Sequence, residues 1–301
     1  MTRTADLPPG LTQRPLTTDD AAALAALITA QELHDVGVAD ADEADILADW
    51  KQPSFDLSSR TLGVFDGDRL VAFGELCGGG HADTAVLPER RGRGIGSAIA
   101  GWLVDSARDH GWPEVGMSVP QGGAGDRLLA DLGFDLRWEA WDLALPPGAE
   151  IEARPLPAGF ALRDSTEADH RAVWTLVEDA FGEFADRPRA ELDDFGARVW
   201  GRPGFEPWNL RLVTDPDGEL VGVTNVVLSG DVGFVQRIAV RRDLRGRGLA
   251  AAMLADAFAL ARSHGATNSG LSTDSRTGAL GLYEKVGMQV ASTWVNRSRT
   301  L

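Results

Sequence analysis

The sequence predicts an α+β protein made of two tandem domains, each with a mixed, mostly antiparallel sheet flanked by helices. Its length of 301 residues suits two domains, each of which is long enough to bury its own core. A glycine-rich stretch also recurs 154 positions apart, at residues 91–96 (RGRGIG) and 245–250 (RGRGLA). We therefore expect an N-terminal domain at residues 1–145, a linker at 146–158 and a C-terminal domain at 159–301.

Each half begins with a helix-start signal that is followed by a hairpin. The pattern T-x-x-D at residues 17–20 and 166–169 predicts capping boxes, in which side-chain oxygens satisfy free N–H groups of the first turn. Asp-Gly pairs at 66–67 and 217–218 then separate short apolar runs, which is typical of two strands joined by a tight turn.

A third strand in each half, ending at residue 86 or 240, runs directly into the glycine-rich stretch. A helix follows, from 97 to about 109 and from 251 to about 263, and a His-Gly pair closes it. We expect His110 and His264 to be helix-end residues and not catalysts. A strand, a short helix and a last strand complete each half.

Composition excludes several classes of function. A net charge of −16 without a long basic run argues against a nucleic-acid partner. The sequence has neither a membrane-length apolar run nor a signal-like N-terminus, so we expect a cytoplasmic protein that is not a membrane protein. Cys77 is the only cysteine, which excludes an internal disulfide and a cluster of thiolate ligands. We expect it to be a small buried hydrophobe, and we predict no metal site.

The glycine-rich stretch suits an anionic ligand such as a pyrophosphate. A strand that enters a loop and then a helix presents free backbone N–H groups at the positive end of the helix dipole, and glycines allow close approach. A P-loop would need Gly-Lys, which is absent, and a dinucleotide fingerprint would need glycine in place of Ser97. The remaining pattern is R/Q-x-x-G-x-G/A, which occurs once in each half.

With these motifs the chain resembles the GNAT acyltransferases, in which this loop holds the pyrophosphate of acetyl-CoA. The resemblance spans nearly the whole chain, once per half, and the two fused units look most like the mycothiol synthase group. In that group the C-terminal unit acetylates a cysteine amine, and the N-terminal unit keeps the fold without catalysing. The resemblance implies acetyl-CoA as cosubstrate and these cofactor-binding residues: Ile238, Ala239, Val240, Arg245, Gly246, Arg247, Gly248, Leu249 and Ala250, with Val86, Arg91, Gly92, Arg93, Gly94, Ile95 and Gly96 in the first half.

A single tyrosine distinguishes the two halves, because Tyr283 stands where the first half has Leu129. The resemblance implies an N-acetyltransferase in which a primary amine of a small molecule attacks the thioester directly. A backbone N–H near residues 238–240 would hold the oxyanion, and Tyr283 would protonate or hydrogen-bond the departing thiolate. Since Leu129 cannot donate a proton, we expect catalysis in the C-terminal domain, in a monomer or homodimer.

The identity of the general base is left open by the sequence. Gln236 occupies the strand position where the family often has a carboxylate, and an amide cannot accept the proton. Asp231, Glu178 and Glu183 are candidates, although each also fits the role of an ordinary surface acid. Arg276 replaces an asparagine that is common in the family seven residues before the tyrosine.

Two alternative functions follow from the same residues. A non-catalytic acyl-CoA-binding protein is favoured by Gln236 and opposed by Tyr283, whereas an acetyltransferase for a protein or aminoglycoside amine differs only in its acceptor. Most rings of an aromatic set in the second half are expected in the core, and others could line an acceptor pocket. The set is Trp174, Phe181, Phe184, Trp200, Phe205 and Trp208.

Overall fold

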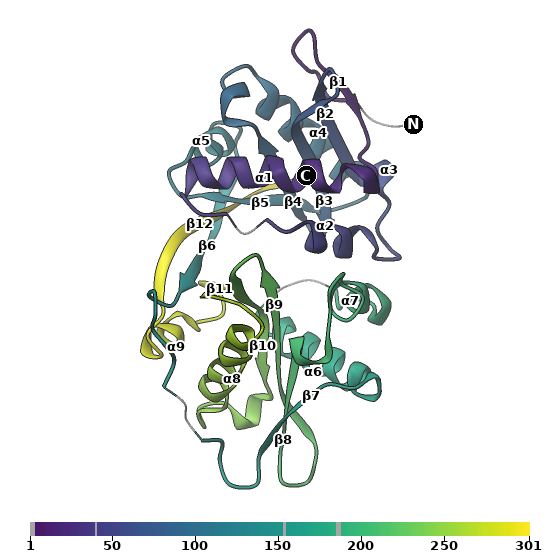
Figure 1. The fold of residues 1–301 in the computed structure, drawn as a ribbon. Helices are drawn as coiled ribbons and strands as arrows, with labels where there is room; N and C mark the ends of the chain where they lie inside the picture. Colours follow the sequence, from purple (N-terminus) through teal and green to yellow (C-terminus); the bar gives the residue numbers. More distant parts are fainter. Residues whose placement is uncertain (1–3, 40, 153–154, 185–187) are drawn as a thin grey trace. The chain divides into compact units, whose positions relative to one another are not determined.

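In a computed structural model of the chain, the sheet of the first half is completed by the last strand of the chain (Figure 1). β12 (Gln289–Thr300) pairs antiparallel with β5 (Glu114–Pro120). β6 (Asp135–Ala144) pairs antiparallel with β11 (Asn268–Asp274) of the second half. The chain therefore divides into unit 1, Met1–Glu139 with Thr293–Leu301, and unit 2, Ala140–Ser292. The boundaries expected from the sequence, at 145 and 159, assign β6 to the first domain and β12 to the second. They do not include this exchange of strands.

The structure describes residues 4–39, 41–152, 155–184 and 188–301. In unit 1 the strands are arranged in the order β1-β2-β3-β4-β5-β12. The elements of unit 1 other than β5, β6 and β12 are β1 (Thr12–Arg14), α1 (Ala21–Asp35), α2 (Glu43–Trp50), α3 (Leu57–Arg60), β2 (Thr61–Asp66), β3 (Arg69–Gly78), β4 (His81–Val86), α4 (Ile95–Asp109) and α5 (Ala124–Asp131).

Unit 2 repeats this plan with the strand order β6-β11-β10-β9-β8-β7. Its further elements are β7 (Ala161–Asp164), α6 (His170–Gly182), α7 (Leu192–Arg198), β8 (Leu210–Thr214), β9 (Leu220–Ser229), β10 (Val232–Val240), α8 (Leu249–Ser263) and α9 (Leu280–Lys285). Each unit is a mixed sheet with helices packed on it, so the predicted α+β class and the tandem arrangement are confirmed.

The local signals read from the sequence are present in both units. Both capping boxes form, at Thr17 with Asp20 and at Thr166 with Asp169. His110 is the C-cap of α4, as predicted, and His264 is the C-cap of α8. The helices α4 and α8 start two residues earlier than expected, because the second glycine of each loop, Gly94 or Gly248, is itself the N-cap.

Glycines on the central strands bring the long helices α4 and α8 close to the sheet. A Cβ at Gly74 of β3 would lie 2.6 Å from Cγ2 of Ile99 on α4. A Cβ at Gly222 of β9 would lie 2.9 Å from Sδ of Met253 on α8. Both helices therefore pack on their sheets through fully buried faces, which fixes the position of the loop at their N-termini.

None of the helices in the described ranges is both long and apolar enough to cross a bilayer.

Candidate active site

The two glycine-rich loops have the same backbone geometry. The N-caps Gly94 and Gly248 have φ values of 86° and 83°, and neither helix start receives a side-chain capping hydrogen bond. Gly92 and Gly246 are also left-handed, with φ of 72° and 76°. Four left-handed positions of this kind require glycine, and the uncapped first-turn N–H groups are available to an anion.

The first arginine of each loop braces the loop. In unit 2, Nε of Arg245 donates to the carbonyl of Val240 at 3.0 Å, and its two Nη atoms contact Glu183 at 2.8 and 2.9 Å. In unit 1, Arg91 donates in the same way to Val86 at 3.2 Å and pairs with Asp35 at 2.6 and 2.8 Å. Because their charge is balanced, these arginines position the loop, while its second arginines, Arg93 and Arg247, are exposed.

The sequence analysis missed the acidic partners Asp35 and Glu183 as loop-bracing residues. A signal was present, because both residues lie at the ends of corresponding helices, 148 positions apart. Glu183 was considered only as a possible base. Hydrogen bonding to Arg245 holds the pKa of the Glu183 carboxyl below its usual value, so Glu183 favours the ion pair over taking up a proton.

The strand that precedes the loop in unit 2, β10, separates from β11 near Gln236. β10 and β11 pair in parallel from Val232–Asn268 to Val235–Leu271, although β10 continues to Val240. The register of β10 on β9 shifts between Val235 and Arg237, so Gln236 lies in a β-bulge. Beyond the bulge, β10 residues 237–240 pair with β9 alone among the described residues, so no second strand covers the other edge of β10 there, where the Val240 carbonyl accepts from Arg245.

A polar network holds the bulge in place. Nη1 of Arg237 donates to Oε1 of Gln236 at 3.2 Å and to Oδ1 of Asn225 at 3.1 Å. Asn225 is 2% exposed and donates in turn to the carbonyl of Asn209. Gln236 is thus a hydrogen-bonding residue of the strand, which fits its inability to act as a base.

Tyr283 lies on the short helix α9 and is 6% exposed. It belongs to a hydrophobic cluster that also contains Leu254, Phe258 and Leu271, with Ile238 packed against it. Burial raises the pKa of Tyr283 to about 12, so the phenol keeps its proton throughout the physiological range. The structure therefore brings Tyr283 into the cluster that contacts β10 just beyond the bulge.

In unit 1 the two parallel strands also pair over only part of their length, but a leucine stands at the position of Tyr283. β4 and β5 pair in parallel at His81–Gly116, although β4 continues to Val86 and β5 to Pro120. Leu129 on α5 is 3% exposed and packs in the core of unit 1. The apolar leucine offers no proton donor at the position that Tyr283 occupies in unit 2.

The remaining candidate bases make structural hydrogen bonds. Asp231 precedes β10, at the end opposite the loop, and its carboxylate accepts from Thr267 and Asn268 at 2.7 and 2.8 Å. Glu178 is 7% exposed and accepts from the backbone N–H of Ala190 at 2.9 Å. Arg276 pairs with Asp274 at 2.6 Å and so pins the turn after β11.

Most of the aromatic set packs within unit 2. Trp174, Trp200 and Phe205 pack on the cluster beneath α6 and α7, and the Trp200 ring stacks on His170 at 3.8 Å. Trp208 stacks on His264 at 4.1 Å. Phe181 and Phe184 are each 37% exposed, and Phe184 lies beneath the Arg245 guanidinium. Within this set, Phe184, just after α6, is the ring that the structure places beside a loop residue.

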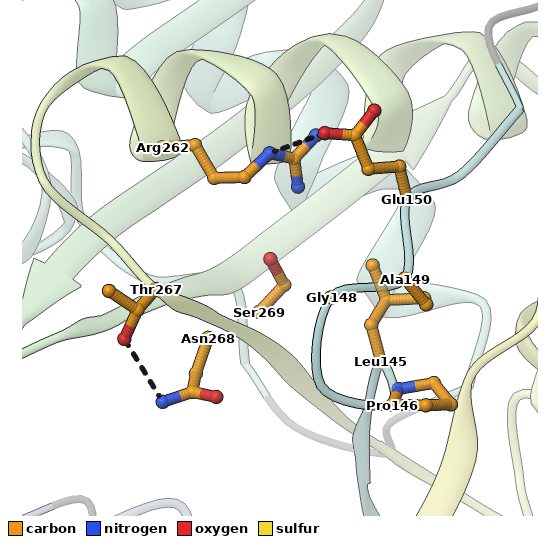
Figure 2. A pocket seen from close by; sticks show the side chains of 9 residues that line it. All are labelled: Leu145, Pro146, Gly148, Ala149, Glu150, Arg262, Thr267, Asn268 and Ser269. Atoms are coloured by element: carbon orange, nitrogen blue, oxygen red, sulfur yellow. Dashed lines mark hydrogen bonds and ion pairs between the residues drawn. The ribbon is translucent and has the colours of Figure 1, made fainter.

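A hollow lies at the C-terminal end of α8 (Figure 2). Arg262 near the C-terminus of α8 contacts Glu150 at 3.5 Å across it, and Thr267 and Asn268 line its opposite side. The loop at 245–250 precedes α8. This hollow is therefore separate from the loop that the sequence predicts to bind the cofactor.

The repeated loop geometry agrees with comparisons with known proteins. A family model described as "Acetyltransferase (GNAT) family" matches residues 24–134 and again 170–288. The chain belongs to the GNAT acetyltransferase family. It is a tandem member and a GNAT-type acyltransferase, because each unit carries one copy of the domain.

Known proteins match this chain over most of its length. A mycothiol acetyltransferase of Clavibacter sepedonicus is 30% identical over 248 residues, which is 77% of this chain and 76% of that protein. A GCN5-related N-acetyltransferase from Sphaerobacter thermophilus matches with a TM-score of 0.77 at 27% identity, over 98% of this chain and 96% of that chain. A tandem GNAT protein of the clavulanic acid pathway has the same fold, with a TM-score of 0.72 at 18% identity over 96% and 98% of the two chains.

Proposed function

We propose that unit 2 transfers the acetyl group of acetyl-CoA to a primary amine of a small molecule, and that unit 1 does not catalyse. The observation that carries this proposal is the unequal pair Tyr283 and Leu129 on corresponding helices of units with matching loops. Since each loop keeps two left-handed glycines, both suit a pyrophosphate, but at the position of Tyr283 unit 1 has the apolar Leu129 in place of a buried proton donor.

In this proposal the loop of unit 2 binds the pyrophosphate through N–H groups at the start of α8 and through exposed Arg247. The open backbone of residues 238–240 holds the rest of the cofactor and the developing oxyanion. The amine nitrogen forms a bond to the carbonyl carbon and loses one proton, while the carbon–sulfur bond breaks. Tyr283 gives its proton to the departing sulfur, and solvent restores it.

The base is assigned to water, because Gln236 cannot accept a proton and Glu178, Glu183 and Asp231 already make structural hydrogen bonds. The amine then reacts in the fraction that is already neutral, and turnover should rise with pH through the titration of the amine itself. A neutral amine is a competent nucleophile without a protein base when the transition state is held by positioned donors.

The proposed acceptor is the amine that mycothiol acetyltransferases acetylate. The reason is that four of these relatives each match 74–84% of this chain, which includes parts of both units. The strongly acidic chain favours a cationic or uncharged amine over an acidic one. A non-catalytic acyl-CoA sensor fits Gln236 but gives no role to a buried tyrosine at this position.

Release of free CoA thiol from acetyl-CoA tests the proposal across a panel of amines that includes the mycothiol precursor. Turnover of one amine by the wild type, with an acetylated amine as product, is the expected result. Cofactor binding without thiol release for any amine would favour the sensor, and turnover of only a protein or an aminoglycoside would replace the acceptor.

A further inference from the structure

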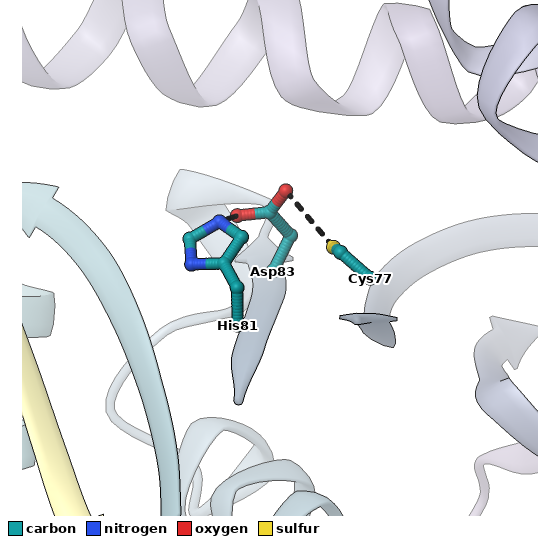
Figure 3. A group of neighbouring side chains, drawn as sticks. All are labelled: Cys77, His81 and Asp83. Carbon is teal, nitrogen blue, oxygen red and sulfur yellow. Dashed lines mark hydrogen bonds and ion pairs between the residues drawn. The ribbon is translucent and has the colours of Figure 1, made fainter. Parts of the chain in front are cut away.

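Unit 1 holds a group of metal-ligating side chains away from its glycine-rich loop (Figure 3). One ligand atom from each of Cys77, His81 and Asp83 can be chosen so that all three lie within 4.8 Å of one another. Sγ of Cys77 lies 3.5 Å from Oδ2 of Asp83, and Nε2 of His81 lies 3.4 Å from Oδ1 of the same residue. The expectation for Cys77 was wrong, because the thiol is only partly buried and faces polar groups.

The backbone of the β3–β4 hairpin creates this grouping. His81 and Asp83 are two residues apart on β4 and so share a face. The register of β3 shifts between Leu76 and Gly78, which leaves Cys77 in a bulge on the side of the sheet away from Leu76. Three left-handed glycines, at 78–80, close the hairpin and bring Cys77 back toward His81.

A further carboxylate, that of Glu75, lies beside Cys77. Glu75 is 7% exposed and stands directly opposite Asp83 in the β3–β4 register. Its Oε2 accepts from the indole of Trp50 at 2.9 Å, and its Oε1 lies 3.9 Å from Sγ of Cys77. The Trp50 bond thus orients one carboxylate oxygen toward the thiol.

The electrostatics of this arrangement call for a cation. Carboxylates directly opposite each other on neighbouring strands destabilise a sheet. Glu75 and Asp83 stand in this relation, so a cation held between them would relieve their repulsion.

We propose that Cys77, His81, Asp83 and Glu75 form a site for a divalent transition metal, best suited to Zn²⁺, in unit 1. A thiolate, an imidazole and two carboxylates are all ligands that Zn²⁺ accepts, with bonds of about 2.0–2.3 Å. Tetrahedral bonds of these lengths separate ligand atoms by roughly 3.3–3.6 Å. One ligand atom each of Cys77, His81 and Asp83 already lies within 4.8 Å of the other two, so small side-chain movements would bring the three to these separations.

The site would close the glycine hairpin and so stabilise the β3–β4 edge of unit 1. It does not depend on the proposed chemistry of Tyr283, which lies in unit 2. A structural metal gives the non-catalytic unit a ligand-binding role of its own, and its binding would release the proton of the Cys77 thiol.

The test is a titration of chelator-dialysed, full-length protein with Co²⁺, followed by displacement with Zn²⁺. We expect one ion per chain, a thiolate-to-cobalt charge-transfer band, and protection of the single thiol against a disulfide reagent. Cys77→Ser should abolish the band, and both Cys77→Ser and Asp83→Asn should weaken Zn²⁺ binding by more than about 10-fold. His34→Gln, an exposed histidine of unit 1, is the matched control and should bind as the wild type does.

Saturating Co²⁺ without a thiolate band would overturn the proposal, as would wild-type affinity in both ligand variants. Circular dichroism of each variant at the same concentration separates loss of the site from loss of the fold, and folded variants with unchanged affinity would count against the site.

Discussion

Arg245 and Glu183 form a two-pronged ion pair, Nη1 to Oε2 at 2.8 Å and Nη2 to Oε1 at 2.9 Å, which ties the glycine-rich loop to the end of α6. Unit 1 repeats the arrangement with Arg91 and Asp35. An arginine that sequence analysis predicts to bind the cofactor therefore shapes the loop, and its effect on binding should be indirect.

Arg245→Gln should weaken acetyl-CoA binding by roughly 1–2 kcal/mol, because it removes a partly exposed ion pair and the hydrogen bond to the Val240 carbonyl. Glu183→Gln keeps the Val240 bond and should cost less. Calorimetric titration of both variants with acetyl-CoA measures the difference, and an equal loss in the two variants would contradict the indirect role.

Matched glycine substitutions separate the roles of the two loops. Gly248→Ala and Gly94→Ala each place a side chain at a left-handed N-cap, where the strain is about 1–2 kcal/mol. Turnover should fall for Gly248→Ala and remain near wild type for Gly94→Ala. Steady-state thiol release checks this, and a larger loss from Gly94→Ala would place catalysis in unit 1.

The absorbance of tyrosinate reports on Tyr283 alone, because Tyr283 is the only tyrosine of the chain. Its titration midpoint in the folded protein should lie near 12, above the ordinary value of about 10, since burial disfavours the phenolate. The neutral ring then stabilises the fold below about pH 10, and this contribution is lost as the pH rises toward 12. A midpoint near 10 before unfolding would show a solvated phenol.

The exchange of last strands makes fragments cut in sequence order incomplete. A fragment of residues 1–145 lacks β12, the partner of β5, and one of residues 159–301 lacks β6, the partner of β11. Each fragment alone should be less stable than the intact chain and prone to association through the exposed strand edge. Thermal unfolding of the separate fragments and of their mixture tests this, and stable monomeric fragments would contradict it.

Much of the fold could be predicted because its signals are local. The capping boxes, the Asp-Gly turns and the glycine loops each act within a few residues, and repetition in the two halves strengthened every one. The strand exchange could not be predicted, because the pairing of β12 with β5 joins residues more than 170 positions apart. Short strands such as β1 and β7 carry too few residues for a clear alternation.

The candidate site was predictable at the level of its motif. The glycines and Tyr283 could be named from the sequence, whereas the bulge at Gln236 depends on its register with β9. The group proposed to bind a metal in unit 1 could not be predicted for a similar reason. Cys77 looks isolated along the chain, and only the hairpin bulge places it beside His81, Asp83 and Glu75.

Tyr283→Phe removes one hydroxyl and keeps the packing of the ring, so it isolates the proposed proton donor. We expect kcat for thiol release to fall by about 10²–10⁴-fold while acetyl-CoA affinity stays within about twofold of the wild type. An unchanged kcat would contradict the assignment of catalysis to Tyr283.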